Sequence, residues 1–341
     1  MSQLRVLNHP PRGLFNTPAR ELAQVLGGPT LIYVQGDQNP PLFISTLLHG
    51  NETSGWQALC EVLGNGARLP RSVLLFLGNL DAAAQGARSL PGQMDFNRIW
   101  RGANKHQPMV DELLQRLAQQ PLLAALDIHN NTGRNPHYSV VTEITPQTSG
   151  LAYLFSDKAV WVEEPDSVLT RAVQHLCPAT TVEVGPVDDP QSTVRTADLL
   201  QRYVELHEVP EEPPENLTLH RALARVHVVD GVAFDFADEM DEARLRDDDL
   251  VLTAGMEAVN FHAVAEGTEF GFTRKPLHQT LQVLDAAHRD VTAQFLEEVH
   301  GDVSLCRAVV PAMYTTDRDV IRQDCLCYFM EEIESPIDGG T

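Results

Sequence analysis

The sequence predicts an α/β protein in which a mostly parallel mixed sheet carries helices on both faces, followed by a smaller β-rich domain. In the first two-thirds of the chain, uninterrupted apolar runs alternate with helical patterns, which is typical of a sheet covered on both sides. The stretch HEVPEEPPEN at 207–216 is rich in proline and glutamate and is predicted to be an exposed linker. Beyond it the apolar runs become short and are broken by glycine and aspartate. We therefore predict a first domain at 1–210 and a second at 217–341.

The elements of the first domain follow from their patterns in chain order. PLFISTLLHG and SVLLFLGN are apolar enough for buried strands, whereas WQALCEVLGNG and QPMVDELLQRLAQ have helical spacing. The predicted strands lie at 41–50, 72–79, 121–130, 137–143 and 179–186, and the predicted helices at 56–66, 107–119, 169–176 and 192–206. Residues 78–102 show no clear period and are predicted to form a long loop, a kind of segment that is often functional in compact domains.

The second domain is predicted to consist mainly of short strands, placed within 222–230, 233–236, 248–255, 260–273 and 324–333. One helix, at 277–301, is predicted to interrupt them. The sequence shows no internal repeat and no low-complexity tract.

The composition excludes several classes of protein. Hydrophobic residues make up 43% and charged residues 21% of the chain, as in a soluble globular protein, and we see neither a membrane-spanning run nor a secretory signal. A net charge of −22 argues against a nucleic-acid partner, which would need a basic surface. The five cysteines are odd in number and include no CxxC, which favours a reduced, cytoplasmic protein. The oligomeric state stays open, and a homo-oligomer is one outcome.

Polar residues stand where three predicted strands of the first domain end. His49 and Glu52 follow the first of these strands, His129 and Asn130 end another, and Glu183 ends a third. Because the carboxyl ends of parallel strands converge, two histidines and one carboxylate could hold a catalytic Zn²⁺ and leave one position for water. The remaining carboxylate would serve as the base.

Asp127 lies two residues before His129, on the same face of the predicted strand, where it could orient the imidazole. With thirteen histidines in the chain, a single HxxE match would be unremarkable by itself. A competing pair, Glu297 and His300, has helical spacing but is interpreted as a solvated pair at a helix end.

The predicted loop at 78–102 carries an unusual concentration of arginine for so acidic a chain. Arg88, Arg98 and Arg101 lie in it together with Asp95 and Asn97. Arginine pairs with a planar carboxylate through two hydrogen bonds, so the loop could bind a compact anionic substrate. The alternative is a solvated loop whose charges balance nearby acids.

The four motifs HGNE, GN…GAR…DFNR, DIHN and EVGP, in this order, resemble the succinylglutamate desuccinylase/aspartoacylase family, part of the zinc carboxypeptidase clan. The resemblance covers the motifs of residues 43–190, about half of the chain, and the β-rich tail looks like the family's second domain. It implies a zinc carboxypeptidase-like fold and one Zn²⁺ per chain.

The resemblance also implies roles for single residues. It implies that His49, Glu52 and His129 bind the metal, that Glu183 is the general base and that Arg88 polarises the scissile carbonyl. Asn97 and Arg98 match the pair that holds the substrate carboxylate, and Asn130 is expected to shape the pocket and to contact the substrate. The spacing around Arg88 is slightly stretched, and DFN stands where relatives often have DLN or DMN. The family's catalytic tyrosine has no secure match, although Tyr314 is a candidate.

The sequence therefore predicts a zinc-dependent hydrolase that cleaves the amide bond of a small, anionic N-acyl amino acid, such as N-succinylglutamate or N-acetylaspartate. A metallocarboxypeptidase acting on short peptides would use the same zinc and arginines. An inactive binding module that keeps the zinc fold would be expected to lack a ligand or the base, and a structural metal site would need a fourth protein ligand.

Overall fold

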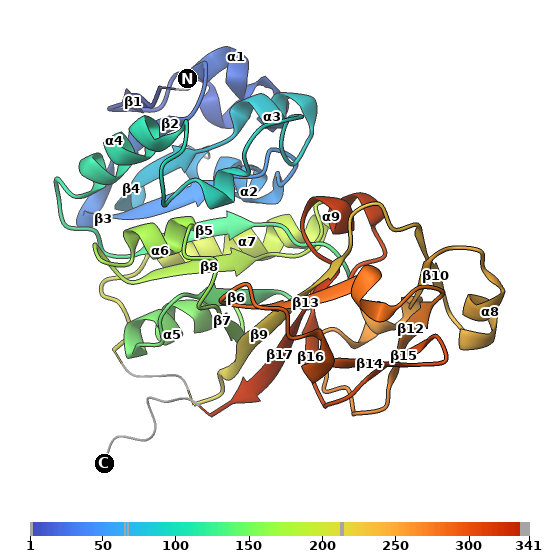
Figure 1. The fold of residues 1–341 in the computed structure, drawn as a ribbon. Helices are drawn as coiled ribbons and strands as arrows, with labels where there is room; N and C mark the ends of the chain where they lie inside the picture. The colour runs from blue at the N-terminus through green and yellow to red at the C-terminus, as the bar shows by residue number, and fades with distance from the viewer. Residues whose placement is uncertain (1–2, 65, 67, 212–214, 335–341) are drawn as a thin grey trace. The chain divides into compact units, whose positions relative to one another are not determined.

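The computed structural model describes residues 3–64, 66, 68–211 and 215–334, which form two compact units (Figure 1). Among the described residues, unit 1 contains 3–130, 137–219 and 334, and unit 2 contains 131–136 and 220–333. The short segment 131–136, within the predicted first domain, thus packs with unit 2. Part of the predicted linker, residues 212–214, lies outside the described residues.

Unit 1 is built on a mixed sheet with the strand order β1-β2-β4-β3-β5-β8-β6-β7. Its strands are β1 (Arg5–Leu7), β2 (Thr30–Val34), β3 (Gly36–Thr46), β4 (Leu69–Leu77), β5 (Ala125–His129), β6 (Tyr138–Val141), β7 (Lys158–Trp161) and β8 (Ala179–Glu183). Within the described residues of this sheet, only the β2–β4 and β6–β8 pairings are antiparallel. The predicted mostly parallel mixed sheet is confirmed.

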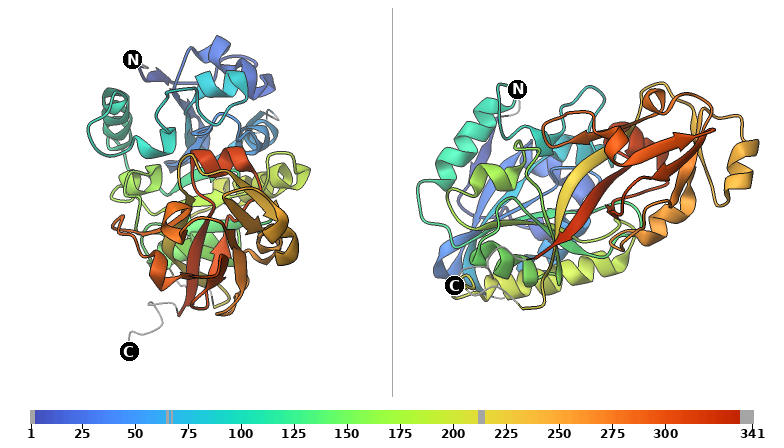
Figure 2. Two further views of the ribbon diagram at one scale, coloured as in Figure 1. Left: turned by 45° about the vertical axis from the view of Figure 1, so that its right-hand side comes forward. Right: turned by 60° about the horizontal axis from the view of Figure 1, so that its bottom comes forward.

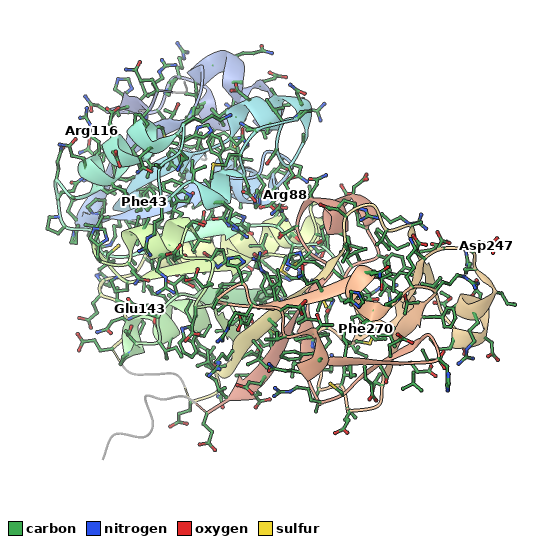
Figure 3. The ribbon with its side chains drawn as sticks, in the orientation of Figure 1. Phe43, Arg88, Arg116, Glu143, Asp247 and Phe270 are labelled. Carbon is green, nitrogen blue, oxygen red and sulfur yellow. The ribbon has the colours of Figure 1, made fainter. Side chains whose placement is uncertain are left out.

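Helices cover both faces of this sheet (Figure 2). They are α1 (Leu22–Leu26), α2 (Ser54–Gly64), α3 (Leu80–Gln85), α4 (Gln107–Leu117), α5 (Pro146–Tyr153), α6 (Leu169–Val173) and α7 (Pro190–Val204), with 3-10 turns η1 (Leu14–Asn16), η2 (Ala19–Glu21) and η3 (Phe96–Arg98). Successive strand residues face opposite sides. Leu42 and Ile44 of β3 therefore join the core beneath α2 and α7, whereas Phe43 joins the core beneath α4 and α6 (Figure 3).

The strand order places the ends of β3, β5 and β8 side by side. β3 pairs in parallel with β4 on one side and with β5 on the other. The next strand in the chain, β4, is added on one side of β3, and the following strand, β5, on the opposite side. Ligands bind at such switch points in open α/β sheets, beyond the carboxyl ends of the strands. The predicted site residues of unit 1 follow these strand ends.

Unit 2 is rich in strands, as predicted. β13 (Leu281–Asp285), β9 (Thr218–Val228), β17 (Cys327–Ile333) and β16 (Val310–Ala312) adjoin in that order, β9 entering from unit 1. A second sheet has the order β10-β11-β12-β15-β14. These strands are β10 (Phe234–Ala237), β11 (Leu250–Thr253), β12 (Glu269–Thr273), β14 (Leu296–Val299) and β15 (Asp302–Leu305). The short helices are α8 (Met240–Leu245), α9 (Arg318–Gln323), η4 (Ala254–Val259), η5 (Leu277–Gln279) and η6 (Thr292–Gln294). Phe270 lies inside this unit (Figure 3).

The predicted helix at 277–301 is wrong, because that segment forms β13 and β14 with two 3-10 turns. Its turns contain residues in the left-handed region, His288 at φ 57° and His300 with Gly301 at φ 55° and 92°. Two such residues in succession make the tight turn that joins antiparallel strands, here β14 and β15. The rival pair Glu297 and His300 is consequently divided between a strand and a turn.

The predicted loop at 78–102 needs a smaller correction, because its first part forms α3 and a later part forms η3. Both elements are too short to give a helical period in the sequence. Among the residues that the structure describes, no helix combines the length and the apolar character needed to cross a bilayer.

Candidate metal centre

His49 and Glu52 lie on the turn between β3 and α2. The turn begins at Leu47, a fully buried leucine with φ 59°, a backbone conformation that leucine rarely adopts. Gly50 lies against the first turn of α3, since a Cβ there would come 2.2 Å from the backbone nitrogen of Ala83. The close packing fixes the path of the turn and brings both potential ligands to the sheet edge.

His129 is the last residue of β5 and is paired in register with Glu183 at the end of β8. Nδ1 of His49 lies 2.7 Å from Oε1 of Glu52, and Nδ1 of His129 lies 2.8 Å from Oε2 of the same carboxylate. One ligand atom from each of the three residues can be chosen so that all lie within 4.8 Å of one another, and all three side chains are buried. The group could therefore hold a metal ion.

An aspartate supports each histidine on the opposite ring nitrogen. Nε2 of His129 lies 3.0 Å from Oδ2 of Asp127, and Nε2 of His49 lies 3.0 Å from Oδ1 of Asp95. A histidine that donates its Nε2–H to a carboxylate presents an Nδ1 lone pair on the other side, the arrangement typical of metal-binding histidines. The prediction placed Asp127 beside His129, whereas it assigned Asp95 no role.

The donor set fits a cation. Two Nδ1 lone pairs and the Glu52 carboxylate converge in a buried space, where unscreened negative ends repel unless a positive charge lies among them. Burial favours the neutral imidazoles, but Glu52 and Asp95 together outweigh it for His49, and Asp127 with Glu52 outweighs it for His129, so both pKa values are raised. Burial likewise opposes ionisation of Glu52, but the two histidines hold its pKa well below the usual range.

The carboxyl group of Glu183 faces the three potential metal ligands. Its Oε2 is shielded from solvent and has no hydrogen-bond partner within the described part of the chain. Burial raises the pKa of the Glu183 carboxyl to about 7; Glu52 acts in the same direction and His129 opposes it. A carboxyl with a pKa near neutrality is suited to accept and return a proton.

Arg88, labelled in Figure 3, lies in the segment after α3 and contacts two of the acidic groups. Its Nη1 lies 3.5 Å from Oε1 of Glu52 and its Nη2 lies 3.5 Å from Oδ2 of Asp95. The backbone carbonyl of Arg88 accepts the N–H of Gly50 at 3.1 Å. Burial opposes ionisation of Asp95, but His49, Arg88 and Arg98 lower its pKa.

Asn97 and Arg98 form η3 immediately after Asp95. Oδ1 of Asp95 accepts the N–H of Asn97 at 2.7 Å and so begins the turn. Nη1 of Arg98 donates to the carbonyl of Asn97 at 3.0 Å. Among the described residues, Oδ1 of Asn97 is buried without a partner, so its side chain retains hydrogen-bonding capacity for a ligand. Arg101 instead pairs with Asp166 on the exposed surface.

Asn130 has its side chain occupied by protein groups. Its Oδ1 accepts the N–H of Ser54 at 3.2 Å, while its Nδ2 donates to Oγ of Ser54 at 2.9 Å and to the carbonyl of Gly185 at 2.7 Å. Its backbone N–H donates to Oε2 of Glu52 at 3.2 Å. These contacts connect β5 to the start of α2 and to the exit of β8, which favours a positioning role over the predicted substrate contact.

Tyr314 lies in the hydrophobic core of unit 2. Its ring packs edge-on against Phe236 and Phe270, and its hydroxyl donates to the carbonyl of Thr253 at 3.0 Å. The side chain is fully buried, and burial raises its pKa well above the usual value. Tyr314 therefore acts as a core residue of unit 2 in this structure.

Part of the chain matches a known protein family. Residues 38–206 match the succinylglutamate desuccinylase/aspartoacylase catalytic domain family. Among curated protein sequences, no significant match is found.

Solved structures share the fold at low sequence identity. The chain is 16% identical to a succinylglutamate desuccinylase from Vibrio parahaemolyticus, over 89% of this chain and 86% of that one, with a TM-score of 0.55. It is also 16% identical to murine aminoacylase 3, over 87% and 96% of the two chains, with a TM-score of 0.51. It is likewise 16% identical to the product-bound ectoine utilization protein EutE from Ruegeria pomeroyi, over 89% of this chain and 84% of that one, with a TM-score of 0.54. At these identities the likeness establishes the fold.

Proposed function

The chain belongs, through residues 38–206, to the succinylglutamate desuccinylase/aspartoacylase family, and on this premise we propose that it is a zinc-dependent deacylase of small N-acyl amino acids. One observation carries the proposal. Both imidazoles turn their Nε2 atoms to aspartates and their Nδ1 atoms to Glu52, which leaves three converging donors for a cation. Three protein ligands suit a catalytic Zn²⁺, because a closed structural site would need a fourth.

We assign His49, Glu52 and His129 to the metal, one ion per chain, in the catalytic domain predicted at 1–210. Zn²⁺ bound there would supply Lewis acidity toward the acyl carbonyl oxygen and toward water. The preference for zinc over harder cations follows from the two imidazole ligands.

Glu183 serves as the general base and then as the general acid. Its Oε2 accepts a proton from the attacking water as the water oxygen forms a bond to the acyl carbon. The same oxygen returns that proton to the amide nitrogen as the carbon–nitrogen bond breaks. The new carboxylic acid releases the other water proton to solvent, so the products are a carboxylate and the free amine of the amino acid. The pKa of about 7 allows both transfers near neutral pH.

Arg88, Asn97 and Arg98 act on the substrate. The Arg88 guanidinium stands 3.5 Å from Glu52 and donates to the oxygen on which negative charge develops. Arg98 and the unpartnered Oδ1 of Asn97 bind the polar groups of the amino-acid portion, with the arginine pairing its carboxylate. Asn130 holds Glu52, α2 and the exit of β8 in place. A local concentration of arginine overcomes the repulsion of an anion by a chain of net charge −22.

The substrate class is a small anion of the N-succinylglutamate or N-acetylaspartate type. None of the five cysteines, which all lie among the described residues, forms a disulfide, and this suits the cytoplasm as the place of action. Steady-state hydrolysis of a panel of N-acyl amino acids, run beside short peptides with the zinc-loaded protein, tests the proposal. A preference for the peptides would favour a metallocarboxypeptidase, and inactivity on both sets with zinc bound would favour a binding module.

A further inference from the structure

Asn79 and Gln93 form a reciprocal amide pair near the metal centre. Nδ2 of Asn79 donates to Oε1 of Gln93 at 3.0 Å, and Nε2 of Gln93 donates to Oδ1 of Asn79 at 3.0 Å. Oε1 of Gln93 also accepts the backbone N–H of Leu90 at 2.8 Å. Asn79 is only 1% exposed, so its side chain loses its hydrogen bonds to water on folding. The bonds to Gln93 replace them in one defined geometry.

Asn79 is itself anchored to two elements. Its Oδ1 accepts the N–H of Ala82 at 3.3 Å and so caps α3 at its first turn. Its backbone N–H donates to the carbonyl of Leu47 at 2.6 Å, where the strained turn toward His49 and Glu52 begins. The amide pair therefore joins the segment that contains Gln93 to the turn that carries two of the ligands.

The segment closed by this pair delivers the charged groups that surround the ligands. Arg88 lies between Asn79 and Gln93, and its guanidinium stands 3.5 Å from Glu52 and from Asp95. Asp95 follows Gln93 by two residues and contacts Nε2 of His49 at 3.0 Å. A segment without a regular backbone ladder needs side-chain hydrogen bonds to hold such groups in place.

We propose that Asn79 and Gln93 are positioning residues that hold Arg88 and Asp95 against the metal ligands. A neutral amide pair suits this task better than an acid. A carboxylate at either position would lose one of the two reciprocal bonds and would add negative charge to the region that already contains Asp95. The proposed role of Asp95, which is to hold His49 as a ligand, depends only on the presence of a metal site. The proposed role of Arg88 rests on the proposed function.

The first test measures the order of the segment and the affinity for zinc. Gln93→Leu removes the pair but leaves the cap of α3 and the bond to Leu47 intact. Amide hydrogen exchange of residues 86–95 should become faster in Gln93→Leu, and zinc affinity in competition with a chelating dye should fall by about 10-fold. Gln85→Leu, at the exposed end of α3, is the matched control and should change neither. Unchanged exchange and unchanged zinc affinity in Gln93→Leu would overturn the proposal.

The second test asks whether the pair acts through Arg88. Gln93→Leu should lower kcat/KM by about 10-fold in the wild-type protein and far less in an Arg88→Ala background, because residues that act through one another are not additive. A merely structural role would give the same factor in both backgrounds and would refute the link to Arg88. If the wild-type protein hydrolyses no N-acyl amino acid, the proposed function fails, while hydrogen exchange and zinc affinity still decide the positioning role.

Discussion

Oδ2 of Asp127 lies 3.0 Å from Nε2 of His129, two residues further along the same buried strand. Residues two apart on a strand face the same side, so β5 builds this carboxylate–histidine pair from local geometry. Asp95 makes the equivalent contact with His49 from a distant segment. The centre therefore combines one histidine oriented by its own strand with another oriented by a loop.

Replacing Asp127 should weaken metal binding in two steps. Asp127→Asn keeps an oxygen that can accept the Nε2–H of His129 but removes the negative charge. We expect zinc affinity to fall by about 10-fold in Asp127→Asn and toward about 100-fold in Asp127→Ala, which loses the acceptor as well. Competition titration with a chelating dye measures both changes. Equal affinity in all three proteins would show that Asp127 does not orient the imidazole.

Glu183→Gln should separate zinc binding from turnover. The amide keeps the size of the side chain but cannot take a proton from water. We expect kcat to fall by about 10²–10⁴-fold, the usual contribution of a general base. Metal analysis of the same preparation should still find zinc. Normal hydrolysis by this variant would exclude Glu183 as the base.

The pH profile should report the same carboxyl. Glu183 is a base only above its pKa, so kcat/KM should fall as the pH decreases. Burial raises that pKa to about 7, and a bound cation would lower it again. The acid limb should therefore have its midpoint above about 4.3, the value for an exposed glutamate, and at or below 7. A midpoint at or below the exposed value would mean that the bound cation cancels the effect of burial on the pKa of Glu183.

The raised pKa of Glu183 also predicts a loss of stability with rising pH. The folded carboxyl, with a pKa of about 7, binds more protons than the unfolded one between about pH 4.3 and 7. The free energy of unfolding therefore decreases as the pH rises through this window. Thermal unfolding of the metal-free protein should show a smaller decrease in Tm from pH 5 to pH 8 in Glu183→Gln than in the wild type.

The parts of the site that were predictable from the sequence follow strand ends. Each apolar run that forms a strand of the site is followed by or ends in a site residue: His49 with Glu52, His129, and Glu183. A parallel sheet therefore brings these residues together irrespective of the loop conformations. The role of Asp95 was not predictable in this way. Its partner His49 lies on another element, and the aperiodic segment between α3 and η3 gives no spacing from which to infer the contact.

The wrong helix at 277–301 has a similar origin. The chain turns back where the side chain of Asp285 accepts the backbone N–H groups of Ala287 and Arg289, each at 2.9 Å. Such local hydrogen bonds compete with a helix. The pair His300–Gly301 was the other signal, because glycine favours the positive φ that a tight turn between strands requires. Turn chemistry outweighed the helical pattern at both places.

Removal of the metal should destabilise the protein. Without a cation, the raised pKa values of His49 and His129 favour protonated imidazoles beside Glu52, and the stabilisation that a metal provides by binding only the folded protein is lost. A chelator should lower Tm and added Zn²⁺ should restore it, with about 2.7 kcal/mol of stabilisation when free zinc is 100 times its Kd. His49→Ala should lose most of this response. A Tm that is indifferent to chelator and zinc in the wild type would argue against the metal centre.

Gly50→Ala should damage the metal centre through packing alone. A Cβ at Gly50 would come 2.2 Å from the nitrogen of Ala83 and 2.3 Å from the carbonyl carbon of Ala82. Both atoms are backbone and cannot rotate away, so the turn carrying His49 and Glu52 must move. We expect the free energy of unfolding to fall by about 1–3 kcal/mol, as in other overpacked sites. Zinc affinity should fall with it.

Gly255→Ala is the matched control for that substitution. Gly255 lies in η4 of unit 2, and a Cβ there would meet nothing within 4 Å. The control should stay within about 0.5 kcal/mol of the wild type in denaturant unfolding and should bind zinc unchanged. If Gly50→Ala behaves like this control, the turn after β3 is free to adjust, and its close contact with α3 does not set the position of the ligands.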